Sequence, residues 1–189
     1  MPSLRDSRRR VSLRPFGSFV IIALGLLALP RGAVARTVSD PTLGITFTVP
    51  DDCESTPVPP STRFTNHFAC RMTRGDHGIG VVVGADRRMM TKGERNDPQA
   101  LAAYRANAAR FSIEPIRWQS FDLEVVRLSL EQQGRSTVSR MVRLPIRDHA
   151  VVLAVGGDRE LDAEIASTTQ TVVASVRGPI GWAPSRRFF

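Results

Sequence analysis

Apolar and polar residues alternate along several short stretches of the chain. Ile45, Phe47 and Val49 alternate with threonines, and Pro50 follows them. This period of two is typical of a strand that buries one face, and two later stretches are also strand-like. Three strands are predicted in this half of the chain, at residues 43–50, 63–73 and 79–85. The residues before them, 36–42, are predicted to be a linker.

A second group of alternating stretches occupies the other half of the chain. Val126, Leu128 and Leu130, for example, are separated from one another by polar or charged residues. The connections are short enough for hairpins, with turns at Gln133-Gly134 and Arg147-Asp148. Four strands are predicted here, at residues 115–121, 123–132, 135–145 and 149–155. Their one-sided alternation indicates an antiparallel sheet with one solvated side.

Two helices are predicted beside these strands. Asp97 can cap a helix that begins with Pro98. Its apolar stripe, at spacings of three and four, is Leu101, Tyr104, Ala108 and Phe111. The second helix covers residues 158–177, after a turn at Gly156-Gly157 and before the stop at Gly178-Pro179.

The predicted elements belong to one α+β domain at residues 43–178. We expect an antiparallel sheet of about six to seven strands, covered by the two helices. A C-terminal tail at residues 179–189 follows the domain.

The first 35 residues have the pattern of a secretory signal peptide. Several arginines precede an apolar run at residues 16–29, and the small residues Ala33-Val34-Ala35 follow it. The run is 14 residues long, whereas a helix needs roughly 20 to cross a bilayer. Cleavage between Ala35 and Arg36 is therefore favoured over a retained signal anchor. The arginines match a twin-arginine signal only in part, so export by the general secretory route and by the twin-arginine route both stay open. We expect a periplasmic or secreted protein.

Most of the net positive charge lies in this signal segment. The whole chain has a formal net charge of +8, but the residues after Ala35 comprise 20 basic and 17 acidic side chains, a net charge of +3. These charges are interspersed, which argues against a nucleic-acid partner. No later apolar run is long enough to cross a bilayer, so we expect no membrane span after cleavage.

Both cysteines, Cys53 and Cys70, follow the signal segment. Disulfides persist in the oxidising compartments beyond the membrane, so we predict a bond between them. It would close a loop of about 17 residues and contribute on the order of 3 kcal/mol. The alternative is a metal site with His67 and His77, but three residues along a strand separate His67 and Cys70 onto opposite faces. No cysteine follows the signal at the position of a lipid anchor.

The order and spacing of these elements resemble the PsbP-like superfamily. The resemblance rests on the strand from Gly44 to Pro50, the helix from Pro98, the hairpins of residues 115–155 and the closing helix. The superfamily includes the photosystem II subunit PsbP, a nuclear Ran-binding protein, DcrB-type envelope proteins and type VI secretion effector chaperones. The resemblance implies that this chain is a binding or assembly module without catalytic activity. The chain departs from DcrB in lacking a lipidation cysteine and from the chaperones in having a signal peptide, and no residue role is carried over.

Candidate catalytic motifs are weak. Gly78, Gly80 and Gly84 superficially suggest a phosphate loop, but the required strand, loop and helix are missing, so these glycines are predicted to interrupt a strand. A serine or cysteine nucleophile needs a histidine in reach. The histidines of the chain are His67, His77 and His149. We predict no catalytic, cofactor-binding or metal-binding residue.

Aromatic residues in the tail are the remaining candidates for function: Trp182, Phe188 and Phe189. They either pack back on the core or contact a partner. The predicted function is a non-catalytic extracytoplasmic module that binds an envelope protein or component. Two alternatives stay open: a small periplasmic hydrolase or metal-dependent enzyme, and a periplasmic immunity or inhibitor protein.

Overall fold

The computed structural model of this chain describes residues 35–92, 96–132 and 134–183. All of them lie in the second of the two units into which the chain divides, Ala33–Phe189. The predicted signal peptide lies outside the described residues except for Ala35, and so do Phe188 and Phe189.

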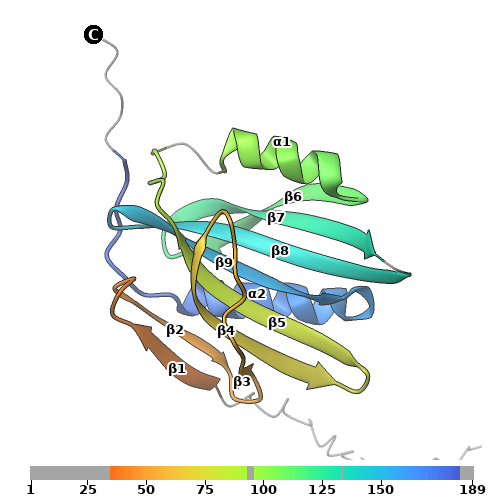
Figure 1. Cartoon of the computed structure of the whole chain (residues 1–189). Helices are drawn as coiled ribbons and strands as arrows, with labels where there is room; N and C mark the ends of the chain where they lie inside the picture. Colours follow the sequence, from red (N-terminus) through yellow and green to blue (C-terminus); the bar gives the residue numbers. More distant parts are fainter. Residues whose placement is uncertain (1–34, 93–95, 133, 184–189) are drawn as a thin grey trace, which may run out of the picture. The chain divides into compact units, whose positions relative to one another are not determined.

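Seven strands form one antiparallel sheet in the order β3-β4-β5-β9-β8-β7-β6 (Figure 1). Their bounds are β3 Glu54–Ser55, β4 Thr65–Arg74, β5 His77–Asp86, β6 Arg110–Trp118, β7 Phe121–Gln132, β8 Arg135–Ile146 and β9 His149–Asp158. A separate two-stranded sheet pairs β1, Ala35–Asp40, with β2, Ile45–Pro50. Two α-helices, α1 (Pro98–Asn107) and α2 (Asp162–Ser175), complete the described part. The predicted α+β fold class is therefore confirmed.

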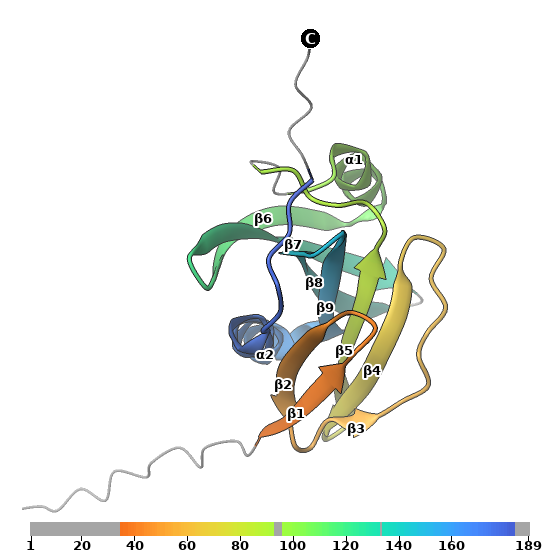
Figure 2. The same ribbon diagram turned by 90° about the vertical axis from the view of Figure 1, so that its left-hand side faces the viewer.

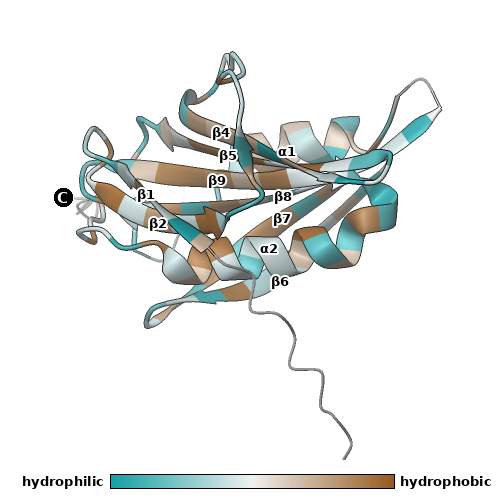
Figure 3. Ribbon diagram, turned by 90° about the horizontal axis from the view of Figure 1, so that it is seen from below, coloured by the Kyte–Doolittle hydropathy of each residue, from teal (hydrophilic) through white to brown (hydrophobic). Residues whose placement is uncertain are grey.

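One face of the large sheet carries the main core. The register aligns Val83, Leu153, Val142 and Val125 across four neighbouring strands, and all four are buried. Helix α2 packs its buried apolar side chains against this face, among them Ile165, Val172 and Val173. Figure 3 shows apolar positions along the central strands beside α2. The β1–β2 hairpin adds Phe47, whose ring meets that of Phe68 edge to face, with centroids 5.3 Å apart.

Helix α1 lies on the opposite side of the sheet from α2 (Figure 2). Its predicted start is confirmed, because the Asp97 side chain accepts a hydrogen bond from the N–H of Gln99 and Pro98 follows the cap. The predicted apolar stripe is wrong at its end, since Ala108 is already the C-cap and Phe111 lies in β6. The chain leaves the helix there because its backbone pairs with β7.

The predicted linker at residues 36–42 is also wrong, because most of it forms strand β1. Every residue of β1 has a pairing partner on β2, and the side chain of Arg36 donates a 2.7 Å hydrogen bond to the carbonyl of Cys53. Its side chains alternate between exposed and half-buried. Backbone pairing thus forms a strand where hydrophobicity gives little signal.

Gly156 and Gly157 were predicted to form a turn, but they lie inside β9 and pair with β5 and β8. The strand continues to Asp158, a 3-10 turn (η1, Arg159–Leu161) follows, and α2 begins only at Asp162. The final helix is therefore shorter than the predicted residues 158–177.

The disulfide between Cys53 and Cys70 is present, with Cα atoms 5.4 Å apart and both residues buried in the core. It connects the segment before β3 to β4. In the part of the chain that the structure describes, no helix has the length and apolar character needed to span a membrane.

Candidate functional site

A polar depression of about 580 Å³ lies where two hairpins and the start of the last helical segment meet. Its walls come from the β4–β5 hairpin, the β7–β8 hairpin and η1. The tips of the two hairpins point to the same side of the molecule (Figure 1). We call this feature the polar depression, because charged, hydroxyl and glycine residues make up its lining.

Glycines form the floor of the polar depression. Arg71 on β4, Gly80 on β5 and Gly156 on β9 are direct partners across three strands. A Cβ atom added at Gly80 would have no neighbour closer than 3.8 Å, which is ordinary van der Waals contact. The fold therefore does not require glycine at position 80, and the missing side chain leaves the backbone uncovered.

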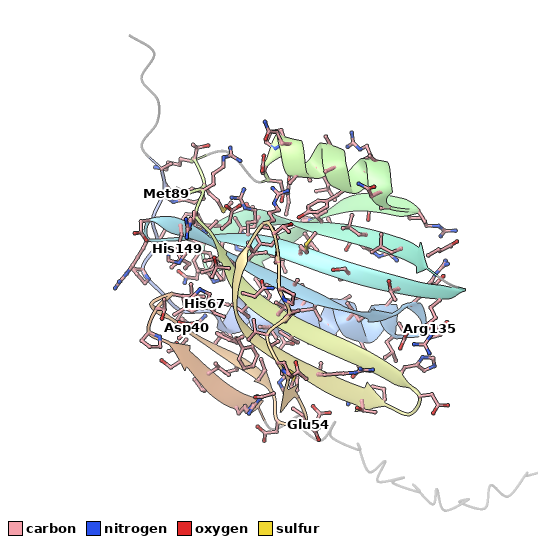
Figure 4. All side chains as sticks on the ribbon, in the orientation of Figure 1. Asp40, Glu54, His67, Met89, Arg135 and His149 are labelled. Atoms are coloured by element: carbon pink, nitrogen blue, oxygen red, sulfur yellow. A yellow bond between two sulfur atoms is a disulfide. The ribbon has the colours of Figure 1, made fainter. Side chains whose placement is uncertain are left out.

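Two arginines flank this floor. The guanidinium group of Arg71 lies against Gly78, where an added Cβ would come within 2.7 Å of its Nε and Nη2 atoms. Arg135 begins β8 on the other side (Figure 4). Among the described residues, neither guanidinium group has a hydrogen bond or an ion pair. Both remain available for a ligand.

Acidic side chains line the same depression. Asp158 is already engaged, because its Oδ2 atom accepts a 3.0 Å hydrogen bond from the N–H of Gly78 and lies 3.5 Å from Nδ1 of His77. Asp76 and Glu160 have no ion-pair or hydrogen-bond partner within the described ranges. The polar depression thus presents unpaired charges of both signs.

The other two histidines line a second depression of about 490 Å³. Nδ1 of His67 lies 3.3 Å from Oδ2 of Asp40, and Nδ1 of His149 lies 2.9 Å from Oδ1 of Asp148 (Figure 4). The bond with His149 lowers the pKa of the Asp148 carboxyl group. No serine, threonine or cysteine bonds to either ring among the residues described, so a nucleophile is not paired with a base here.

A shared metal site for the cysteines and histidines is ruled out, because both sulfur atoms belong to the disulfide. In the described part of the chain, no three His, Cys, Asp or Glu side chains gather in a way that could hold a metal ion. His77 lies in the polar depression and is separate from the second depression with His67 and His149.

A charged cluster ties the start of α2 to the sheet. Arg127 donates a 2.7 Å hydrogen bond to Asp162, and the buried Arg140 pairs with both Glu114 and Asp162. The bond from Arg127 lowers the pKa of the Asp162 carboxyl group, and the same bond raises the pKa of Arg127. These four side chains pair with one another across β6, β7, β8 and α2, and the pairing stabilises the packing of α2.

Trp182 is the one predicted partner-contact residue that the structure describes. Its ring lies 5.7 Å from that of Phe121, edge to face, and packs against the core. The preceding residues also join the domain, since the N–H of Arg147 bonds to the carbonyl of Pro179. At least this part of the tail is integral to the fold, and a partner role for Trp182 stays a prediction.

The sequence did not single out Arg71 or Arg135. The predicted place of Gly80 in a strand is confirmed, whereas Gly78, the predicted boundary of that strand, lies inside β5. The missing information is the pairing of β5 with β9, which brings Gly156 beside Gly80. The available signal for this site was the glycine inside the strand, because such a glycine often marks a place where a ligand or another backbone approaches the sheet closely.

Comparison of the sequence with protein-family models and with curated proteins finds no match. Several solved structures are similar. LpqN of Mycobacterium tuberculosis, described as involved in cell envelope biogenesis, is 16% identical with a TM-score of 0.44, over 76% of this chain and 89% of LpqN. The cyanobacterial PsbP of Synechocystis is 14% identical with a TM-score of 0.47, over 77% and 93%.

The Ran-binding protein Mog1p of Saccharomyces cerevisiae is 14% identical with a TM-score of 0.46, over 77% of this chain and 95% of Mog1p. The likeness concerns the fold, and no residue role is carried from these proteins to this chain.

Proposed function

We propose that this chain is an exported binding protein without catalytic chemistry of its own, and that its ligand occupies the polar depression. The observation that carries the proposal is the pair of unpartnered guanidinium groups, Arg71 and Arg135, beside a floor that Gly80 leaves open. Unpaired charged side chains around an open floor are suited to holding a polar ligand, since they can form charge-assisted hydrogen bonds.

Two features support export. The first 35 residues have the order of a signal peptide, and the buried bond between Cys53 and Cys70 suits an oxidising compartment. Cell fractionation followed by N-terminal sequencing tests this part of the proposal. We expect an extracytoplasmic protein that begins at Arg36. A full-length chain in the cytosolic fraction would contradict it.

The arrangement of the histidines supports a role without catalysis. His67, His77 and His149 each lie beside an aspartate. A general base that activates a nucleophile needs to lie within hydrogen-bond reach of it. No such contact is present among the residues that the structure describes, which favours binding over hydrolysis.

The experiment for the ligand site is photo-crosslinking in intact cells. A photoreactive residue replaces Thr137, which lines the polar depression, and in a matched control it replaces Ser120, an exposed residue of the β6–β7 turn. We expect a discrete adduct from position 137 and none from position 120. Equal labelling from both positions, or none from position 137, would overturn the proposed site.

A further inference from the structure

We infer that the polar depression binds a short peptide segment that carries both acidic and basic groups. This inference rests on the proposed function and adds the chemical class of the ligand. It follows from the unpaired charges, from the open floor and from the size of the depression.

The polar depression carries unpaired charges of both signs. Arg71 and Arg135 have no partner among the described residues, and the same is true of Asp76 and Glu160. A purely anionic ligand would gain from the arginines but meet the two carboxylates, and a purely cationic ligand would meet the arginines. A ligand with groups of both signs can pair with each set, because complementary charges favour binding and like charges oppose it.

The guanidinium groups suit carboxylates in particular. Arginine presents planar donors that bind a carboxylate through two parallel hydrogen bonds. The guanidinium group of Arg71 lies beside Gly78, at the edge of the open floor. Asp76 and Glu160 offer acceptors for ammonium or guanidinium groups. Glutamate, aspartate, lysine and arginine side chains of a peptide supply the matching partners.

The floor suits an extended main chain. Gly80 pairs with Gly156 on the adjacent strand, and the open space lies at Gly80, because a Cβ atom added at Gly156 would already lie 3.0 Å from the carbonyl oxygen of Val138. A flat peptide backbone can therefore approach the sheet closely at Gly80, which a glycine in a strand often permits. The hydroxyl groups of Ser136 and Thr137 border the same space and can bond to peptide groups.

The volume sets the length. At about 580 Å³ the depression falls within the range of roughly 300–1,000 Å³ that is typical of small-ligand sites. It can hold a few residues and not a folded domain. The ligand is therefore a free peptide or an extended segment of a larger protein.

The test uses the exported protein, purified with its disulfide intact. Its binding to fluorescently labelled heptapeptides is measured by fluorescence polarisation. The mixed peptide is Glu-Gly-Lys-Gly-Glu-Gly-Lys. Three comparison peptides replace its charged residues by glutamate alone, lysine alone or serine alone. We expect the mixed peptide to bind at least tenfold more tightly than each of the others, with an affinity that falls as salt is added.

Variants then locate the binding. Gly80→Val fills the open floor, and Arg71→Gln removes one guanidinium group; each should weaken binding of the mixed peptide at least tenfold. The matched controls are Thr37→Val, on the exposed strand β1, and Arg117→Gln, an exposed arginine of β6. Both controls should bind as the unchanged protein does. A melting temperature within a few degrees of the parent shows that each variant is folded.

Three outcomes would overturn the inference: equal binding of all four peptides, no binding of the mixed peptide, or equal binding by Gly80→Val and Thr37→Val. An adduct from position 137 in cells combined with any of these results would leave the proposed function in place and reject the peptide. Failure of both experiments would reject the site itself. A neutral oligosaccharide serves as a further probe. If it bound the parent protein but not Gly80→Val, and the mixed peptide bound neither, the proposed ligand class would be wrong.

Discussion

Two glycines on neighbouring strands differ in the space that surrounds them. A Cβ atom at Gly80 would have its nearest neighbour at 3.8 Å, whereas at Gly157 it would lie 2.1 Å from the carbonyl oxygen of Gly78. Glycine inside a strand costs roughly 0.5–1 kcal/mol relative to alanine, and overpacking costs about 1–3 kcal/mol. We therefore expect Gly80→Ala to keep or raise the free energy of unfolding and Gly157→Ala to lower it by about 1–3 kcal/mol.

Urea denaturation of the two variants measures this difference directly. They form a matched pair, because both add one methyl group to the same pair of strands. An equal loss of stability would show that glycine at position 80 is needed by the fold, which would weaken the argument that its open surface serves a ligand.

Asp162 gives the domain a dependence on pH. The hydrogen bond from Arg127 holds the pKa of its carboxyl group below the ordinary value of 3.8. Because the pKa is lower in the folded than in the unfolded chain, the ionised group stabilises the fold at pH values above about 4. This contribution is lost as the pH falls through the lower, folded-state pKa. Asp162→Asn should therefore lower the melting temperature at pH 7 and have less effect at strongly acidic pH.

Melting curves between pH 2 and pH 7 test this expectation. Asp122→Asn serves as the control, since its exposed carboxylate lies at the start of β7 and pairs with Arg117 on β6, outside the cluster around Asp162. A constant difference in melting temperature between the parent and Asp162→Asn at every pH would show that Asp162 acts through packing and not through its charge.

At the scale of the elements, alternation was sufficient to predict the strands with a buried face, including β2, β7 and β8. It failed at β1, because Val38 is the only aliphatic residue among Arg36, Thr37, Val38, Ser39 and Asp40. That strand exists because its backbone pairs with β2. The end of α1 was misplaced for the same reason, since pairing with β7 begins at Arg110 and overrides the helical spacing of Phe111.

The candidate site could be predicted only in part. Gly78 and Gly80 are visible in the sequence, but their neighbours Gly156 and Arg135 reach the same place through the strand order β5-β9-β8. That order joins a strand from the first half of the domain to a hairpin from the second half. Apolar alternation in single strands contains no information about such distant pairing.

The segment after α2 illustrates how an element without regular structure can belong to the core. The carbonyl of Pro179 accepts from Arg147, the N–H of Gly181 donates to Pro145, and the N–H of Ala183 donates to Met90. Each such hydrogen bond contributes about 1 kcal/mol. Deletion of residues 179–189 should therefore lower the free energy of unfolding by about 3 kcal/mol, with a further loss from the packing of Trp182.

Deletion of residues 184–189 alone is the matched control, because it keeps all three hydrogen bonds. Denaturation in urea should separate the two truncations clearly. Equal stability of the two would mean that residues 179–183 contribute nothing to the fold, and it would restore the reading in which Trp182 serves a partner.

For the molecule as a whole, the disulfide makes the stability of the fold depend on the redox state of the compartment that holds the chain. Cys53 is 0% exposed and Cys70 is 2% exposed, and both lie in the same core as β2 and α2. With a sequence separation of 17 between the two cysteines, the bond should contribute about 3 kcal/mol. Oxidation of these sulfur atoms is slow in a reducing cytosol. A chain in which both thiols stay reduced should consequently be only partly stabilised.

This coupling predicts a specific response to reduction. The chain from Arg36 onward should lose about 3 kcal/mol of its free energy of unfolding when dithiothreitol reduces the bond, whereas the Cys53→Ala/Cys70→Ala variant should start lower and not respond. Urea denaturation with and without the reductant measures both values. A chain that is equally stable in both states would imply that it can fold fully before it leaves the cytosol. Such a chain would be suited to the twin-arginine route, while the predicted loss favours export in an unfolded state through the general secretory route.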